Sequence, residues 1–173
     1  MKQNKYVYRL GWIALIGSTC VLPACGNDDG TTMVGTGGPT TNPAATNVDI
    51  TVGNFFVRPS MSTALEGAIN FRVYNGGTET HEFVVVKTDL TAEQLPMNAD
   101  GSFNEAGAGV EVIDEIETIE PGNTQTLSVN LDNGHYVLLC NRVETEASGE
   151  VVSHFQQGMH VDFNVASRTG VSP

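Results

Sequence analysis

Apolar and polar positions alternate with a period of two over much of the chain from Val48 onward. This period places alternate side chains on one face of a strand, and no sustained helical stripe runs through the same residues. The predicted strands are at residues 48–52, 69–73, 81–87, 110–113, 127–131, 136–140 and 159–165. Asn75-Gly76-Gly77 and Asn133-Gly134 mark turns, and the second pair predicts a tight hairpin. The pattern predicts an all-β fold, an antiparallel Greek-key β-sandwich.

One segment, Thr91–Gly109, has no clean period. It contains Pro96, Asp100-Gly101 and Ala106-Gly107, which interrupt both strands and helices. We expect a crossover or a flap, with a helical turn near residues 91–95.

The first 24 residues are typical of a secretory signal. Lys2, Lys5 and Arg9 give a positive start, and the apolar run that follows, Leu10–Leu22, is shorter than the roughly 20 residues that span a bilayer. The sequence Leu22-Pro23-Ala24-Cys25-Gly26 resembles a bacterial lipoprotein box, which implies that Cys25 is lipidated. The alternative is ordinary cleavage near Ala24, which yields a soluble product. We expect an exported protein, in the periplasm or on the outer surface, held at a membrane through Cys25.

Residues 25–47 are rich in Gly, Thr, Pro and Asn and poor in large apolar residues. Such a segment cannot bury enough surface to offset the entropy lost on ordering, so a flexible tether is predicted. The folded domain is then predicted at residues 48–167, with a C-terminal tail at 168–173.

The charge balance is strongly acidic, with 8 Lys and Arg against 20 Asp and Glu. Removing residues 1–24 removes three basic residues and no acidic one, which makes the balance still more negative. Nucleic acid is excluded as a partner because its phosphates need a basic surface. A redox or other protein partner with a basic docking surface is favoured instead.

The cysteine count draws attention to Cys140. Cys20 lies within the signal and Cys25 at its end, so Cys140 is the only Cys of the folded domain, although exported proteins usually pair their thiols. It could be an inert buried thiol, an intermolecular disulfide, a nucleophile or a metal ligand. Together with His81, His154 and Met159 it provides two imidazoles, a thiolate and a thioether, the ligands of a blue-copper centre.

Strand parity indicates which of these side chains point inward. Met159 shares a face with Val161, Phe163 and Val165, so we expect it in the core and His160 toward solvent. Cys140 shares a face with Leu138 and Tyr136, and His81 with Phe83 and Val85. His135, just after the Asn133-Gly134 turn, is expected to be solvated. The acidic run Asp114, Glu115, Glu117 and Glu120 is expected to form a solvated strand face or loop.

Three stretches carry a resemblance to the cupredoxin family, in particular to plastocyanin-like type 1 (blue) copper proteins. They are His81-Glu82-Phe83-Val84-Val85, Gly134–Asn141 and His154–Met159, within a similarity that covers about residues 48–165. The resemblance implies one copper ion held by His81, Cys140, His154 and Met159, and a ring edge of His154 near the surface that passes electrons to partners. Two features depart from the family. Thirteen residues, 141–153, separate Cys140 from His154, and Glu82 stands where relatives often carry a small polar residue.

The resemblance implies an electron carrier that shuttles single electrons between transient redox partners in the cell envelope. Two alternatives stay open at this point. One is a periplasmic protein that binds and delivers copper, and the other is a metal-free sandwich used for adhesion or as a scaffold. An enzyme is not expected, because trinuclear copper oxidases need many closely spaced His and this chain has no His-x-His pair.

Overall fold

The computed structural model describes residues 44–146 and 148–168. The predicted signal, the lipidation site Cys25, residues 25–43 of the predicted tether and residues 169–173 of the tail lie outside the described residues. Within the described part, no helix is long and apolar enough to cross a membrane.

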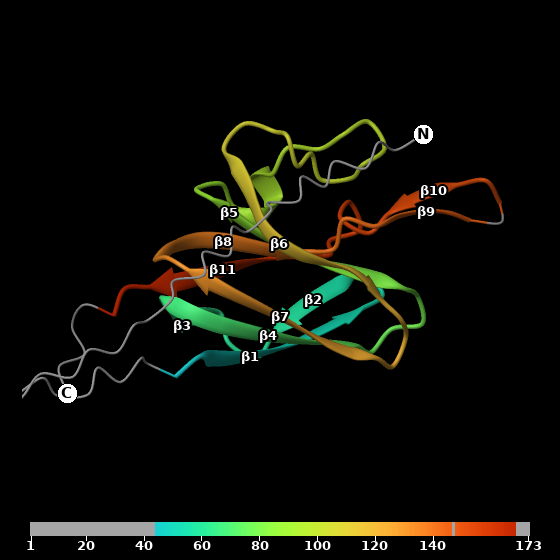
Figure 1. The fold of residues 1–173 in the computed structure, drawn as a ribbon. Helices are drawn as coiled ribbons and strands as arrows, with labels where there is room; N and C mark the ends of the chain where they lie inside the picture. Colours follow the sequence, from blue (N-terminus) through green and yellow to red (C-terminus); the bar gives the residue numbers. More distant parts are fainter. Residues whose placement is uncertain (1–43, 147, 169–173) are drawn as a thin grey trace, which may run out of the picture. The chain divides into compact units, whose positions relative to one another are not determined.

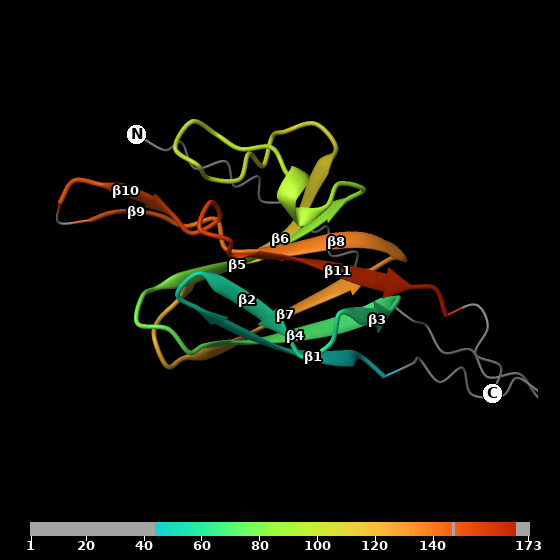
Figure 2. The same cartoon turned by 180° about the vertical axis from the view of Figure 1, so that it is seen from behind.

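Two sheets form the body of the folded unit (Figures 1 and 2). The four-stranded sheet has the order β2 (Phe56–Pro59), β1 (Thr46–Gly53), β4 (Gly67–Asn75) and β7 (Thr124–Leu131). The five-stranded sheet has the order β3 (Thr63–Leu65), β11 (His160–Ala166), β8 (Gly134–Leu139), β5 (His81–Thr88) and β6 (Val110–Ile119). The chain crosses between the sheets from β4 to β5 and from β6 to β7, as in Greek-key sandwiches. The predicted β-sandwich is confirmed.

The main core lies between the two sheets. Alternate residues of β1, β4 and β11 enter it, and the phenyl rings of Phe71, Phe83 and Phe163 are fully buried there. The centroid of the Phe71 ring lies 5.5 Å from that of Phe83 and 5.6 Å from that of Phe163. Met159, Cys140 and the residues that share their faces were predicted to point into the core, and this is confirmed. All of these side chains are buried except that of Val161, which is half-buried.

A second core covers the outer face of the five-stranded sheet. Segment 91–109 lies over this face and contains the 3-10 turn η1 (Ala92–Gln94), which confirms the predicted helical turn (Figure 1). Leu95 and Phe103 of the segment pack with Val84, Val86 and Leu139. Because both faces of β5 and β8 are buried, these strands read as continuous apolar runs rather than alternating ones.

Several strand predictions need correction. The sandwich is not wholly antiparallel, because β1 pairs with β4 and β11 pairs with β3 in parallel. After β1 and β2 the chain continues through β3 at the edge of the other sheet before it returns as β4, which therefore runs in the direction of β1. The strand predicted at 110–113 extends to Ile119, and β1 begins at Thr46, inside the predicted tether.

The Asn133-Gly134 turn is not a hairpin within one sheet. It joins β7 to β8, and these strands belong to different sheets: β7 pairs with β4, whereas β8 pairs with β11 and β5. The turn chemistry was identified correctly, but turn residues alone do not determine whether the flanking strands pair with each other.

Candidate metal centre

His81 is the first residue of β5 and is fully buried. The β4–β5 loop packs closely around it, since a Cβ added to Gly77 would lie 2.9 Å from His81 Nε2. Burial, reinforced by the neighbouring His154, lowers the pKa of His81 to about 4. The imidazole is therefore neutral at physiological pH, which is the form that binds a metal.

Cys140 directly follows β8 and is also fully buried. Its Sγ accepts a hydrogen bond from the backbone N–H of Glu82 at 3.3 Å, so the strand that carries His81 also fixes the sulfur. Burial raises the pKa of the Cys140 thiol to about 11 in the metal-free protein. A metal that binds here must therefore displace a proton from the sulfur.

Between Cys140 and His154, the strand β9 (Val143–Thr145) pairs with β10 (Val151–Ser153) in an antiparallel hairpin. The hairpin extends beyond the two sheets at the end that carries the site (Figures 1 and 2). At its base Ser153 pairs with Val143, and His154 N–H donates to Arg142 O at 2.9 Å. The insertion thus returns the chain to the point where it left, which brings His154 beside Cys140.

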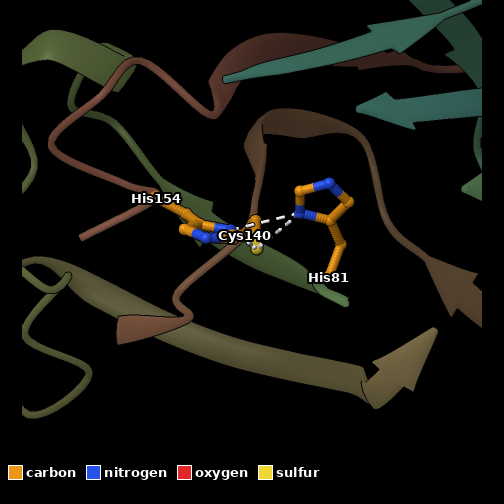
Figure 3. A group of neighbouring side chains, drawn as sticks. All are labelled: His81, Cys140 and His154. Carbon is orange, nitrogen blue, oxygen red and sulfur yellow. Dashed lines mark hydrogen bonds between the residues drawn. The ribbon is translucent and has the colours of Figure 1, made fainter. Parts of the chain in front are cut away.

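Three donor atoms from these elements face one point (Figure 3). The two Nδ1 atoms of His81 and His154 are 3.1 Å apart, and Cys140 Sγ lies 3.5 Å from Nδ1 of His154 and 4.0 Å from Nδ1 of His81. With the bond lengths of zinc, about 2.0 Å to nitrogen and 2.3 Å to sulfur, ligands at a tetrahedral angle lie about 3.3–3.6 Å apart. The three observed distances, 3.1, 3.5 and 4.0 Å, bracket this range, so the three atoms are close enough to bind one ion. Among the described residues this is the one group of three or more His, Cys, Asp or Glu side chains close enough to hold a metal.

The outer nitrogens of the two imidazoles have different surroundings. His81 Nε2 is buried and has no hydrogen-bond partner. His154 Nε2 lies 3.7 Å from Glu79 Oε2 and 3.8 Å from Glu144 Oε1. Burial lowers the pKa of His154, while the two carboxylates oppose this effect. Carboxylates beside Nε2 favour a proton on that nitrogen, which leaves the Nδ1 lone pair free to bind a metal.

Met159 is fully buried, and its backbone bonds to two of these three residues. Its N–H donates to His154 O at 3.1 Å, and its carbonyl accepts from Cys140 N–H at 2.9 Å. The short connection from His154 turns at Gly158, whose φ of +94° is readily adopted only by glycine. The backbone thus brings Met159 to the two residues that its predicted role requires.

The donor chemistry fits one type 1 copper ion. Two imidazoles and one thiolate with a neighbouring thioether are the set found in blue-copper sites, whereas structural zinc sites take four strong ligands. The sandwich and this donor set agree with the resemblance to the cupredoxin family that the sequence motifs carry.

The remaining two histidines lie outside the site, and both predictions for them were partly wrong. His135 is half-buried rather than solvated, and its ring nitrogens contact Thr88 O at 3.0 Å and Asp162 Oδ1 at 3.1 Å. His160 is half-buried rather than turned to solvent. Its ring packs against Phe155 with centroids 4.9 Å apart, and its Nδ1 is buried without a partner.

His154 also differs from the expectation, since its ring edge is not at the surface. Its exposed fraction is 1%. The Phe55 ring lies edge-on to it with centroids 6.2 Å apart, and Glu79 and Glu144 approach its outer nitrogen. Sequence reasoning missed Phe55 and Glu79, although Gly53-Asn54 before Phe55 is a turn signal that could have drawn attention to this loop.

Segment 91–109 braces the loop that carries the ligands, a role that the sequence did not reveal. Phe103 N–H donates to Asn141 Oδ1 at 2.6 Å, directly after Cys140. Ser153 Oγ donates to Gly101 O at 2.8 Å, directly before His154. Both ends of the hairpin insertion are therefore tied to the same covering segment.

The acidic run Asp114, Glu115, Glu117 and Glu120 is exposed as predicted except at Glu115, which meets Glu82 of β5. Glu115 and Glu82 are half-buried, and burial together with neighbouring carboxylates raises the pKa of both, that of Glu82 to about 7. Glu82 contacts Glu115 because β5 and β6 pair side by side, with a register shift next to Glu82.

Comparison with known proteins gives similarity in structure only. No family model matches the chain, and no curated protein is similar to it in sequence. Dithionite-reduced auracyanin from the photosynthetic bacterium Roseiflexus castenholzii overlaps with a TM-score of 0.46 at 20% identity, over 72% of this chain and 99% of that chain. Auracyanin A, a "blue" copper protein from the green thermophilic photosynthetic bacterium Chloroflexus aurantiacus, overlaps with a TM-score of 0.46 at 14% identity, over 70% and 99%. A multicopper oxidase overlaps with a TM-score of 0.42 at 18% identity, over 75% of this chain and 45% of that chain.

Proposed function

We propose that this protein is a one-electron carrier with a single type 1 copper centre held by His81, Cys140, His154 and Met159. The observation that carries the proposal is the approach of two buried imidazole nitrogens and one buried thiol sulfur to one point, within 4.8 Å of one another. When bound, copper supplies a Cu(II)/Cu(I) couple that gains and loses one electron. The residues of the chain hold the ligands, exclude water and limit rearrangement.

The ligands are held by backbone hydrogen bonds rather than by flexible side chains. Glu82 N–H fixes the sulfur of Cys140, and the backbone of Met159 bonds to both Cys140 and His154. All four side chains are at most 1% exposed. A rigid, dry site changes little between oxidation states, which favours fast transfer over storage or release of the metal.

These features weigh against the alternatives. Delivery of copper requires access to the ion, and the described residues bury every proposed ligand. A metal-free scaffold has no use for three buried donor atoms that converge on one point. An oxidase needs further histidines near the first copper, but the two remaining His of the chain are engaged elsewhere.

We further propose that the carrier works in the cell envelope, anchored to a membrane through lipidated Cys25. The support is the positive start, the short apolar run and the lipoprotein-like box of residues 1–26. Its redox partners would dock transiently through basic surfaces, because the chain carries a formal charge of −12.

The test is a visible spectrum after Cu(II) is added to the metal-free protein. We expect an intense Cu–thiolate band in the wild type and a reversible one-electron couple in voltammetry. Cys140→Ser should lose the band, and the matched control His135→Gln, which alters a histidine outside the site, should keep it. A colourless wild type that retains no copper refutes the proposal, and copper that leaves on reduction favours delivery.

A further inference from the structure

His154 is covered on the outside by one exposed aromatic residue. Phe55 lies edge-on to the His154 ring with centroids 6.2 Å apart, and 43% of Phe55 is exposed while His154 is 1% exposed. A partner that docks at this end therefore meets the phenyl ring before it can meet the imidazole.

Phe55 has an unfavourable backbone conformation. Asn54-Phe55 is the two-residue loop of the β1–β2 hairpin, in which Gly53 pairs with Phe56. Phe55 is the one non-glycine residue with positive φ, +68°, among residues 44–146 and 148–168. Positive φ at the second central position alone is the pattern of a type II turn, which normally has glycine there. A bulky aromatic residue in this position is a true outlier, and such strain is concentrated at functional sites.

The strained turn is also held firmly against the metal-site loop. Asn54 Nδ2 donates to Thr78 Oγ1 and Thr78 N–H donates to Asn54 Oδ1, both at 3.0 Å. Gly76 N–H donates to Val52 O at 2.9 Å. These bonds join the β1–β2 turn to the loop that leads into His81, so the Phe55 ring is positioned relative to the ligands rather than left free at the surface.

Carboxylates lie close to the outer nitrogen of His154 and to the loop that leads into His81. Glu79 lies beside His154 with 33% of its side chain exposed, and exposed Glu120 accepts a hydrogen bond from the hydroxyl of neighbouring Thr80. Glu144 is also adjacent to His154, but its charge is balanced by Arg142. An apolar contact with a net negative margin is complementary to a partner that presents an apolar cofactor edge among basic residues.

We infer that Phe55, rather than the edge of His154, is the surface contact through which electrons pass, and that it docks a basic haem protein with Glu79 and Glu120 at its margin. The inference rests on the proposed function. With copper held by the four proposed ligands, the site would give up one electron as Cu(I) became Cu(II), and the ferric haem iron of the partner would become ferrous. No bond forms or breaks and no proton moves. The phenyl ring is not itself oxidised.

The test compares Phe55→Ala with Leu65→Ala, a control that removes a similarly exposed apolar side chain (37%) from β3, which pairs with the far end of β11. The probe is ferric cytochrome c, a basic haem protein, mixed with the reduced, copper-loaded protein in stopped flow. We expect the second-order rate constant of Phe55→Ala to fall about tenfold, the loss typical of truncating an aromatic anchor. The visible band and the potential should stay unchanged, and Leu65→Ala should react like the wild type.

A second readout does not depend on copper. Amide NMR shifts of the metal-free protein on addition of cytochrome c should map to Phe55, Glu79 and Glu120 and should weaken in Phe55→Ala. Urea unfolding of the metal-free protein should show Phe55→Gly to be more stable than Phe55→Ala, because only glycine relieves the positive φ.

The outcomes separate the two proposals. A wild type without the Cu–thiolate band contradicts the proposed function, whatever Phe55 does. With the band present, equal rates for Phe55→Ala and wild type overturn this inference, as do NMR shifts confined to another face. An altered spectrum or potential in Phe55→Ala also overturns it, since Phe55 would then act by holding the ligand set. Self-association through this face in place of cytochrome c binding would overturn it as well.

Discussion

Replacing Glu82 by Gln should stabilise the metal-free protein at neutral and alkaline pH. Glu82 is half-buried on β5, directly after His81, where it meets the carboxylate of Glu115 on β6 and the fields of Glu105 and Glu117. Burial and then these like charges raise the pKa of Glu82 to about 7 from an ordinary value of 4.5. The fold therefore favours the protonated carboxyl, which a Gln side chain imitates at every pH.

The sign and the size follow from this shift. Folding raises the pKa of Glu82, so the protonated carboxyl makes its full contribution to the free energy of unfolding below pH 4.5. This contribution is lost as the pH rises from 4.5 through 7. At 1.36 kcal/mol per pH unit, the ionised carboxylate lowers the free energy of unfolding by at most about 3 kcal/mol above that range. Glu82→Gln should therefore match the wild type near pH 4 and exceed it by up to about 3 kcal/mol near pH 8.

The assay is urea unfolding of metal-free wild type and variant, followed by far-UV circular dichroism across this pH range. The low pKa of His81 acts in the opposite direction, but it is common to both proteins and cancels in the difference. Glu146→Gln, which alters an exposed carboxylate on the hairpin turn, serves as the control and should give a flat difference. If the wild type and Glu82→Gln have parallel stability profiles, the burial and charge argument for Glu82 is wrong.

Three further substitutions test the site and the core. Met159→Leu preserves the buried volume, so the protein should fold and keep its Cu–thiolate band. Voltammetry should show a higher reduction potential, because a donor to Cu(II) is lost. An unchanged potential argues against thioether ligation. Gly77→Ala adds a methyl group that would overlap Asn54 Oδ1 and lie 2.9 Å from His81 Nε2. The change should lower the free energy of unfolding by about 1–3 kcal/mol and weaken copper binding. Wild-type behaviour in both measurements would show that the loop has room to adjust. Phe163→Ala empties a fully buried position between the sheets and should cost about 3–5 kcal/mol in urea unfolding; a loss below about 1 kcal/mol would contradict the packing described.

The strands were largely predictable because the information that specifies them is local. Alternation along β1, β4 and β11 identified both the strands and their inward faces, and its continuation to Met159, just before β11, correctly placed that residue in the core. The candidate ligands were predictable for a chemical reason, since few residue types bind copper and the folded domain contains one Cys and four His. These conclusions did not require knowledge of which strands pair.

The pairing of the strands and the position of the covering segment 91–109 were decided only by the tertiary structure, because both depend on residues far apart in the chain. Sequence patterns did not show that β1 and β4 run in parallel or that segment 91–109 braces Asn141 and Ser153. The inserted residues 141–153 carry weak strand signals, and their hairpin is defined by its own cross-strand pairs.

The sequence by itself determined the class of fold and the donor types, because side-chain period and ligand chemistry are properties of individual segments. Only the tertiary structure decided that His154 is buried beneath Phe55, and that the carboxyl groups of Glu82 and Glu115 are in contact. The exposure and the pKa of a side chain depend on the residues that other elements place beside it. The sequence pattern of a single strand therefore does not determine them.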